Sequence, residues 1–86
     1  MIIEALAAAR EDIRTKTKAQ IDAETASVWG ARAVAAYELY RASSANEWIV
    51  QAAEYAHEAV EHAAGGPPGT LERIKAELSA LTGGLL

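Results

Sequence analysis

The feature that most constrains the fold is a long stretch without helix-breaking residues, from Ile3 to Ala42. Only Gly30 interrupts it, and alanine, leucine, glutamate, arginine and lysine supply most of the other residues. These residue types favour helices, so we expect one continuous or slightly bent helix of about 40 residues. The alternative is a pair of helices that part near residues 15–20, where Thr-Lys-Thr-Lys is a weak helical stretch, with Asp22 as the next N-cap.

Two further breaks organise the rest of the chain. Residues 43–46, Ser-Ser-Ala-Asn, form a connector in which a serine or the asparagine caps a second helix over residues 47–64. The run Gly-Gly-Pro-Pro-Gly at 65–69 ends that helix, because proline lacks an amide hydrogen and clashes with the preceding turn. A short third helix begins after an N-cap at Thr70 and ends at a glycine cap that follows Thr82.

The predicted fold class is therefore all-α. Residues 1–66 form a long antiparallel helical hairpin, with helices over about 3–42 and 47–64. Residues 67–69 are a Pro/Gly linker, and residues 70–86 form a short amphipathic C-terminal helix and tail.

The composition indicates a thin core. The chain has 86 residues, no cysteine and no phenylalanine, and alanine supplies much of its apolar content. A domain of this size buries only a little more than roughly 60% of its unfolded surface, and each alanine adds little area at about 25 cal/mol per Å². Because disulfides are absent, we expect oligomerisation into a helical bundle to complete the fold.

The expected second helix has an apolar stripe and an acidic face on opposite sides. Its apolar residues fall within roughly 120° of arc when each residue advances by about 100°. They are Ile49, Ala52, Ala53, Ala56, Ala59, Val60 and Ala63. Glu54, Glu58 and Glu61 lie opposite this stripe, and His57 and His62 lie at the two borders of the acidic face. The carboxylates therefore point away from the core of the chain.

The segment from Ala26 to Ala42 is apolar on all sides, which is typical of a buried helix. One of its faces contains Val28, Ala31, Ala35 and Leu39, and another contains Trp29, Ala33, Ala36 and Tyr40. One partner helix cannot cover both faces, so we expect a second subunit here, approaching closely at Gly30. The expected oligomer contacts are Val28, Trp29, Ala33, Ala36, Tyr37 and Tyr40.

The histidines and glutamates suggest an alternative function. Glu24, followed by Glu54-x-x-His57, resembles the hairpins of the ferritin-like and encapsulated-ferritin families. The resemblance covers one helix pair and three residues. It implies that a glutamate from one helix and a Glu-x-x-His pair from the next hold iron. Because the second-helix carboxylates face away from the core, such an iron or zinc site would be assembled across a subunit interface. Its candidate ligands are Glu24, Glu54, His57, Glu58 and His62.

The expected C-terminal helix supports a second alternative. Its apolar residues repeat at spacings of three and four and form a narrow seam that needs a partner. They are Leu71, Ile74, Leu78 and Leu81. The chain would then be an adaptor that docks another protein through this helix.

Several functional classes are disfavoured. A net charge of −4 without a clustered basic surface argues against a nucleic acid partner. No run approaches the roughly 18 apolar residues of a membrane-spanning helix. No basic segment followed by an apolar run opens the sequence, so we expect a cytoplasmic protein without a membrane partner. The serines lack a glycine elbow and a neighbouring histidine, which argues against a hydrolase.

The favoured function is therefore non-enzymatic. We expect a small helical oligomerisation or scaffold protein that acts with copies of itself or as a subunit of a larger assembly. No cofactor is expected, except iron or zinc in the metal-binding alternative. A ferroxidase-like activity is the only enzymatic alternative.

Overall fold

The computed structural model describes residues 2–86, and all of their side chains except those of residues 2 and 12–15. The described chain is all-helical. Its four helices are α1 (Ile2–Thr15), α2 (Lys18–Ser43), α3 (Asn46–Ala64) and α4 (Thr70–Leu81). Within the described residues, none of these helices is long and apolar enough to cross a membrane.

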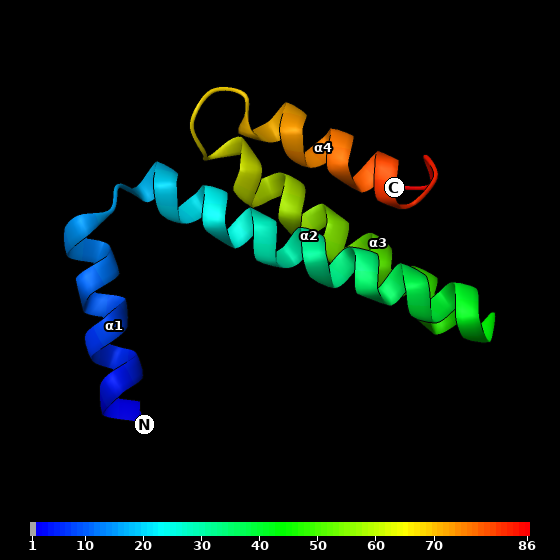
Figure 1. Cartoon of the computed structure of the whole chain (residues 1–86), viewed down its shortest axis with the longest axis horizontal. Coiled ribbons are helices and arrows are strands. Elements are labelled where there is room, and N and C mark those ends of the chain that lie inside the picture. Colours follow the sequence, from blue (N-terminus) through cyan, green and yellow to red (C-terminus); the bar gives the residue numbers. More distant parts are fainter. Residues whose placement is uncertain (1) are drawn as a thin grey trace.

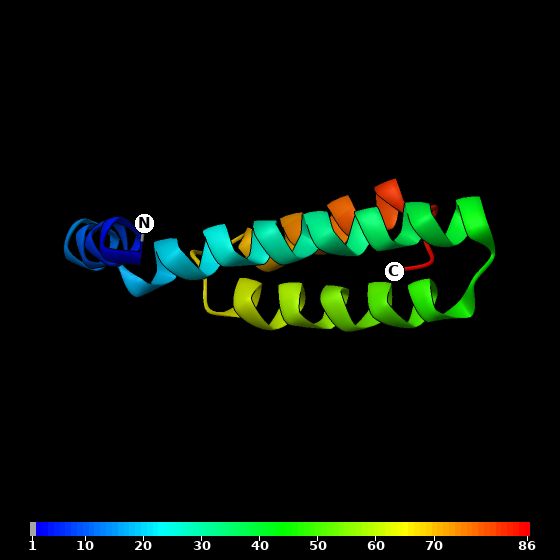
Figure 2. The ribbon, with the colours of Figure 1, turned by 90° about the horizontal axis from the view of Figure 1, so that it is seen from below.

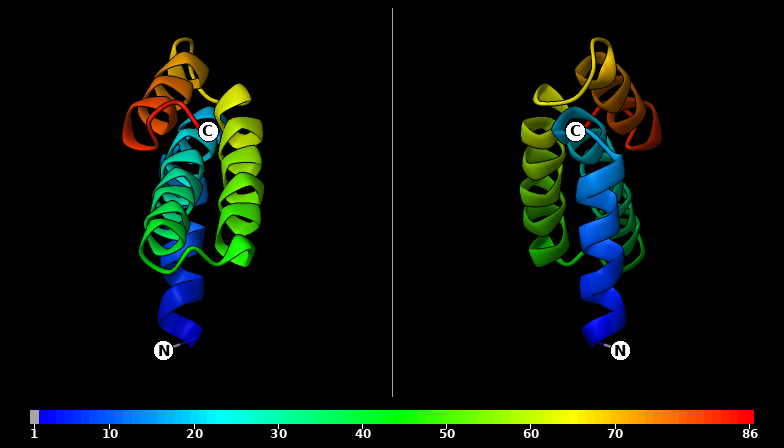
Figure 3. Two further views of the ribbon diagram at one scale, coloured as in Figure 1. Left: turned by 90° about the vertical axis from the view of Figure 1, so that its right-hand side faces the viewer. Right: turned by 90° about the vertical axis from the view of Figure 1, so that its left-hand side faces the viewer.

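Helices α2 and α3 form the antiparallel hairpin that the sequence predicts, and α4 folds back beside them (Figure 1). α4 runs antiparallel to α3 and in the same general direction as α2, and it contacts both helices. The molecule is flat, with principal extents of 43 × 33 × 14 Å (Figure 2). α1 extends away from this three-helix core and has no extensive contact with it among the described residues (Figure 3).

The core consists mainly of alanine side chains. Among the side chains that the structure describes, nine apolar ones are buried, and seven of these are alanines from α2 and α3. They are Ala26, Ala33, Ala36, Ala52, Ala56, Ala59 and Ala63. Ile74 and Leu78 of α4 complete it. Small side chains let α2 and α3 approach closely but bury little area, so α4 supplies the two large aliphatic groups of the core.

The continuous helix expected over residues 3–42 is wrong, because the chain breaks between Thr15 and Lys18. Thr17 is the N-cap of α2, and its Oγ1 accepts a hydrogen bond from the Gln20 amide at 3.2 Å. The Thr17 amide in turn donates to Gln20 Oε1 at 2.9 Å, which completes a capping box. The break lies where the alternative placed it, but Thr17 rather than Asp22 is the cap. The Thr17 side chain accepts the hydrogen bond of a backbone amide at the start of α2. Helix propensities do not include this competition between a side chain and the helical backbone.

The connector between α2 and α3 also differs from the prediction, since neither a serine nor Asn46 caps α3. Ala45 occupies the N-cap without a side-chain hydrogen bond, and Asn46 is the first helical residue. Ser43 Oγ instead donates to the Leu39 carbonyl at 2.7 Å and accepts from the Ala45 amide at 3.2 Å. Ser44 adopts a left-handed conformation with φ 59° and ends α2.

The predicted N-cap of α4 is wrong, whereas its predicted C-terminal glycine cap is confirmed. Gly69, with φ 92°, occupies the N-cap that we expected for Thr70, which is instead a buried residue of the helix itself. Glycine adopts this φ without steric cost, so the chain can reverse at this point. The glycine cap at the C-terminal end is confirmed, because Gly83 has φ 64° and the Gly84 amide donates to the Ser79 carbonyl at 2.7 Å.

Candidate functional site

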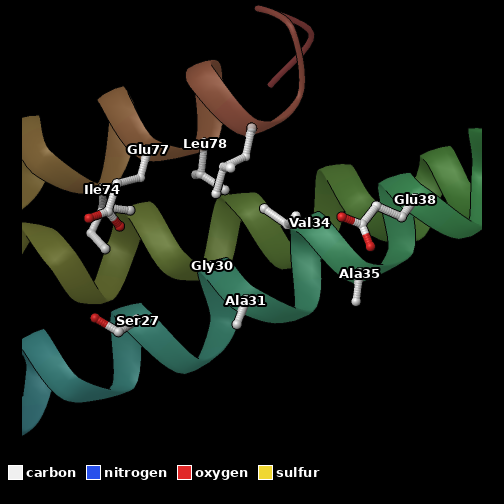
Figure 4. A pocket seen from close by; sticks show the side chains of 10 residues that line it. Ser27, Gly30, Ala31, Val34, Ala35, Glu38, Ile74, Glu77 and Leu78 are labelled. Atoms are coloured by element: carbon white, nitrogen blue, oxygen red, sulfur yellow. The ribbon is translucent and has the colours of Figure 1, made fainter.

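A groove of about 350 Å³ lies between α2 and α4 (Figure 4). Its α2 side contains Ser27, Gly30, Ala31, Val34, Ala35 and Glu38, and its α4 side contains Ile74, Glu77, Leu78 and Leu81. The space beside Gly30 is open, because a Cβ added there would have no heavy atom within 4 Å. The groove is therefore mainly apolar, and it carries two carboxylates.

A second apolar surface adjoins this groove. We call the exposed side of α2 that contains Val28, Ala31, Ala35 and Leu39 the outward face. The side chains of Val28 and Leu39 are 52% and 46% exposed. Ala31 and Ala35 also line the groove. The groove and the outward face therefore form one continuous apolar surface along α2.

An aromatic cluster occupies the opposite edge of α2. The rings of Trp29 and Tyr55 lie with their centroids 5.6 Å apart, and the Arg32 guanidinium lies 4.8 Å from the centre of the Trp29 ring. A shallow hollow of about 670 Å³ runs beside these rings, between Trp29 and the α3 residues Val50 and Glu54. Trp29, which we expected at an oligomer contact, thus already packs within the chain.

The expected oligomer contacts divide between the core and the surface. Ala33 is 0% exposed and Ala36 is also buried, so the structure corrects these two assignments. They face α3 and have almost no surface to offer a second subunit. Tyr37 and Tyr40 are half-buried, and only Val28 is largely exposed. Gly30, where we expected the close approach of a second subunit, lines the groove and has open space beside it.

The expected docking seam of α4 packs inside the chain instead. Ile74 and Leu78 are buried in the core, and Leu71 is half-buried against it. Leu81 alone of the four remains largely exposed, at the end of the groove. The seam needs a partner, as its pattern indicates, but that partner is the α2–α3 hairpin.

The candidate metal ligands are dispersed. Glu24 lies near the start of α2, where Lys16 Nζ donates to its Oε1 at 2.8 Å and to its Oε2 at 3.0 Å. Glu54 is exposed on α3, where Gln51 donates to it at 3.3 Å. Among the described residues, no three histidine, aspartate or glutamate side chains form a group that could hold a metal ion. The structure thus contains the helical hairpin of the ferritin resemblance, while its described side chains provide no ligand cluster within the chain.

The two histidines make separate contacts at the two borders of the acidic face. His57 Nε2 lies 3.0 Å from Glu61 Oε1, one turn further along α3. His62 Nε2 lies 3.9 Å from Glu58 Oε2, and its Nδ1 lies 3.6 Å from Asp22 Oδ1 on α2. Each histidine therefore has its own carboxylate neighbours, and the two rings do not converge.

Asp22 lies where the start of α2 meets the end of α3. Lys18 Nζ donates to its Oδ2 at 2.6 Å, and this hydrogen bond is the main cause that lowers the pKa of Asp22 below its ordinary value. Partial burial opposes the shift, and His62 adds to it. Gly65 lies directly against the carboxylate, so a Cβ at this position would overlap Asp22. The absent side chain of Gly65 therefore makes room for this contact between helices.

Two features of the surface were not identified from the sequence. Periodicity alone did not show that Gly30 and Glu38 would face α4 across a groove, because the placement of α4 depends on contacts distant in sequence. The separation of α1 was signalled by Thr17 and Gln20, which are spaced as a capping box. Ile3 and Leu6, on a helix apart from the core, are consequently exposed.

Comparisons with known proteins found no match for this chain. No protein-family model matches it. No curated protein and no solved structure matches it either. The surfaces of the folded chain are therefore the basis for its function.

Proposed function

We propose that this protein is a non-enzymatic helical assembly subunit that acts by associating with copies of itself or within a larger assembly. One observation carries the proposal. After α3 and α4 have packed on α2, the outward face still exposes Val28 and Leu39 beside Ala31 and Ala35. Contiguous apolar surface of this kind is typical of protein interaction sites.

The composition of the core supports the same proposal. Seven of the nine buried apolar residues are alanines, so folding of one chain removes little apolar area per residue from water. Covering the outward face in an assembly would add to that area. Association would therefore stabilise the fold and form the functional particle together.

The test is the mass of the native protein by light scattering, together with a charge placed on the outward face. A single chain has a mass of 9.1 kDa, and we expect a multiple of it at micromolar concentration. Ala35→Glu puts a carboxylate at the centre of the outward face and should reduce the mass to that of one chain. Ala53→Glu is the matched control, because Ala53 is exposed on α3. A folded wild-type protein that stays monomeric would falsify the proposal.

A further inference from the structure

We propose that the groove between α2 and α4 receives the α1 helix of a second copy of this chain, so that two copies exchange their α1 helices. The inference rests on the self-association proposed above and names the surfaces that make it. It follows from the free helix, the open groove, their charges and the length of the connector between α1 and α2.

α1 is an amphipathic helix that lacks an extensive partner within the described part of its own chain. Ile3 and Leu6 lie three residues apart, so they share one side of the helix, and both are exposed. α1 makes no extensive contact with the three-helix core among the described residues. An isolated helix of 14 residues is marginal in water, so tertiary or quaternary packing must stabilise it.

The length of α1 matches the length of the groove. α1 has 14 residues and is about 21 Å long, and the α2 side of the groove from Ser27 to Glu38 covers about 17 Å. Gly30 leaves open space in the groove at a cost of roughly 1 kcal/mol relative to alanine inside a helix. A helix packed over Gly30 would fill that space, and Ile3 has the size to do so.

The charges of α1 and of the groove are complementary. Arg10 lies one turn beyond Leu6 on the same side of α1, and it makes no ion pair with the described residues. Of the two carboxylates in the groove, Glu77 is already paired with Arg73 at 3.3 Å, whereas Glu38 makes no ion pair with any described side chain. Placing Leu6 beside Val34 brings Arg10 beside Glu38, because each of these pairs is separated by four residues, about one turn, along its own helix. α1 then runs parallel to the α2 helix that receives it.

The connector excludes the same contact within one chain. α1 and α2 are joined by Lys16 and Thr17 alone, so an α1 folded back on its own α2 would be antiparallel to it. Leu6 would then lie near Ser27, at the far end of the groove from Glu38. Only a second copy places Arg10 at Glu38. The hydrogen bonds between Lys16 and Glu24 and the Thr17 capping box also hold the connector in its observed form.

The size of the contact favours reciprocal exchange. A stable interface uses about 20–30 residues on each side. Ten residues line the groove, and one side of α1 contributes roughly six more. Each copy in an exchanged pair contributes both surfaces, and the adjoining Val28 and Leu39 bring the total close to the lower end of that range. One α1 in one groove would fall well below it.

The first experiment is sedimentation of the full chain with single substitutions on α1. Leu6→Glu should weaken dimerisation by more than about a hundredfold, because the exchanged pair buries this leucine twice. Ala8→Glu is the matched control on the opposite, exposed side of the same helix, and it should leave the dissociation constant within about threefold. If Leu6→Glu dimerises like the wild type while Ala35→Glu does not, self-association stands and the exchange is overturned. A monomeric wild type would overturn both proposals.

The second experiment reverses the proposed ion pair. Arg10→Glu and Glu38→Arg should each weaken dimerisation roughly tenfold, because the two-fold symmetric dimer contains the pair twice. The double variant should recover most of that loss. If the double variant dimerised as weakly as the single variants, the contact between Arg10 and Glu38 would be contradicted. A substitution that only disturbed its own helix would not be rescued by the other substitution.

The third experiment uses the absence of cysteine from the natural chain. The double variant Leu6→Cys/Ala35→Cys should oxidise to a covalent dimer on a non-reducing gel. Leu6→Cys/Ser27→Cys reports the alternative, in which α1 folds back on its own α2. The exchange would be overturned if Leu6→Cys/Ser27→Cys formed a disulfide within one chain and Leu6→Cys/Ala35→Cys formed no covalent dimer. α1 would then pack on its own α2.

Discussion

The two short helices of this protein, α1 and α4, have similar lengths but opposite surroundings. α1 has 14 residues and α4 has 12, and each carries apolar residues at helical spacing. Ile74 of α4 is 1% exposed, whereas Ile3 of α1 is 83% exposed. An amphipathic pattern therefore indicates that a helix needs an apolar partner, but it does not say whether that partner belongs to the same chain.

The connectors explain the difference between the two helices. The Gly/Pro run before α4 ends in Gly69, whose positive φ helps the chain to turn back onto α2 and α3. The connector before α2 is only two residues long, and the Thr17 side chain fixes where α2 begins. A short capped connector keeps α1 away from its own core and leaves Ile3 and Leu6 exposed, as the proposed exchange of α1 helices requires.

The largest expected effect breaks the docking of α4. Ile74→Ala should lower the free energy of unfolding by about 2–5 kcal/mol, because it opens a cavity in a core with few large side chains. Ile3→Ala, measured at the same low protein concentration, should change it by no more than about 0.5 kcal/mol. Urea unfolding followed by circular dichroism measures both. Similar losses for the two variants would contradict the contrast between α4 and α1.

A smaller effect concerns the connector that returns the chain to α4. Gly65→Ala should cost roughly 1–2 kcal/mol, because the added methyl group displaces the Asp22 carboxylate from its place against the end of α3. Gly30→Ala is the matched control within a helix, with open space around the new methyl group. At a protein concentration low enough to keep the chain monomeric, it should stabilise the fold by about 0.5–1 kcal/mol. Thermal unfolding of the two variants should therefore shift in opposite directions.

The connector between α1 and α2 can be altered by removing its cap. Thr17→Ala should cost about 1 kcal/mol, because it removes the side-chain acceptor of the Gln20 amide. It should also raise the helix content slightly, since alanine allows α1 to continue into α2. Ser79→Ala, on the exposed side of α4, is the control. An unchanged stability together with unchanged helix content would show that the cap does not maintain the break.

The smallest expected effect is a dependence of stability on acid pH. The pKa of Asp22 is lowered in the folded protein from its ordinary value of 3.8. Its carboxylate therefore adds stability above that value, and the contribution is lost as the pH falls through the lowered pKa. Asp22→Asn should flatten the acid side of the stability profile between about pH 6 and pH 3. Glu54→Gln should leave that slope unchanged, and equal slopes in the wild type and Asp22→Asn would contradict the assignment.

Local patterns predicted the elements better than their ends. The all-α class, the α2–α3 hairpin, the Gly/Pro break and the glycine cap after Thr82 follow from short-range propensities, and the structure contains all four. The prediction of one long first helix was wrong at Thr17, where a side chain competes with the backbone for hydrogen bonds. The N-caps at Ala45 and Gly69 likewise lack the polar side chains by which caps are recognised.

The candidate surfaces were predicted only in part, for a geometric reason. Periodicity correctly separated two faces of α2, one around Val28 and Leu39 and one around Ala33 and Ala36. It did not say which face α3 would cover. The structure places Ala33 and Ala36 in the core and leaves Val28 and Leu39 exposed. Choosing between two equally apolar faces of a helix requires the packing of the whole chain.

The amino-acid sequence alone indicates that this protein is helical, that its core is thin, and that each amphipathic helix needs a partner. These properties follow from residue types and their spacing, which act over a few residues along the chain. Which helices pack together became clear only from the fold of the whole chain. That fold placed α4 on the hairpin and kept α1 apart, because the direction in which a helix leaves its connector depends on caps, on glycine conformation and on contacts distant in sequence.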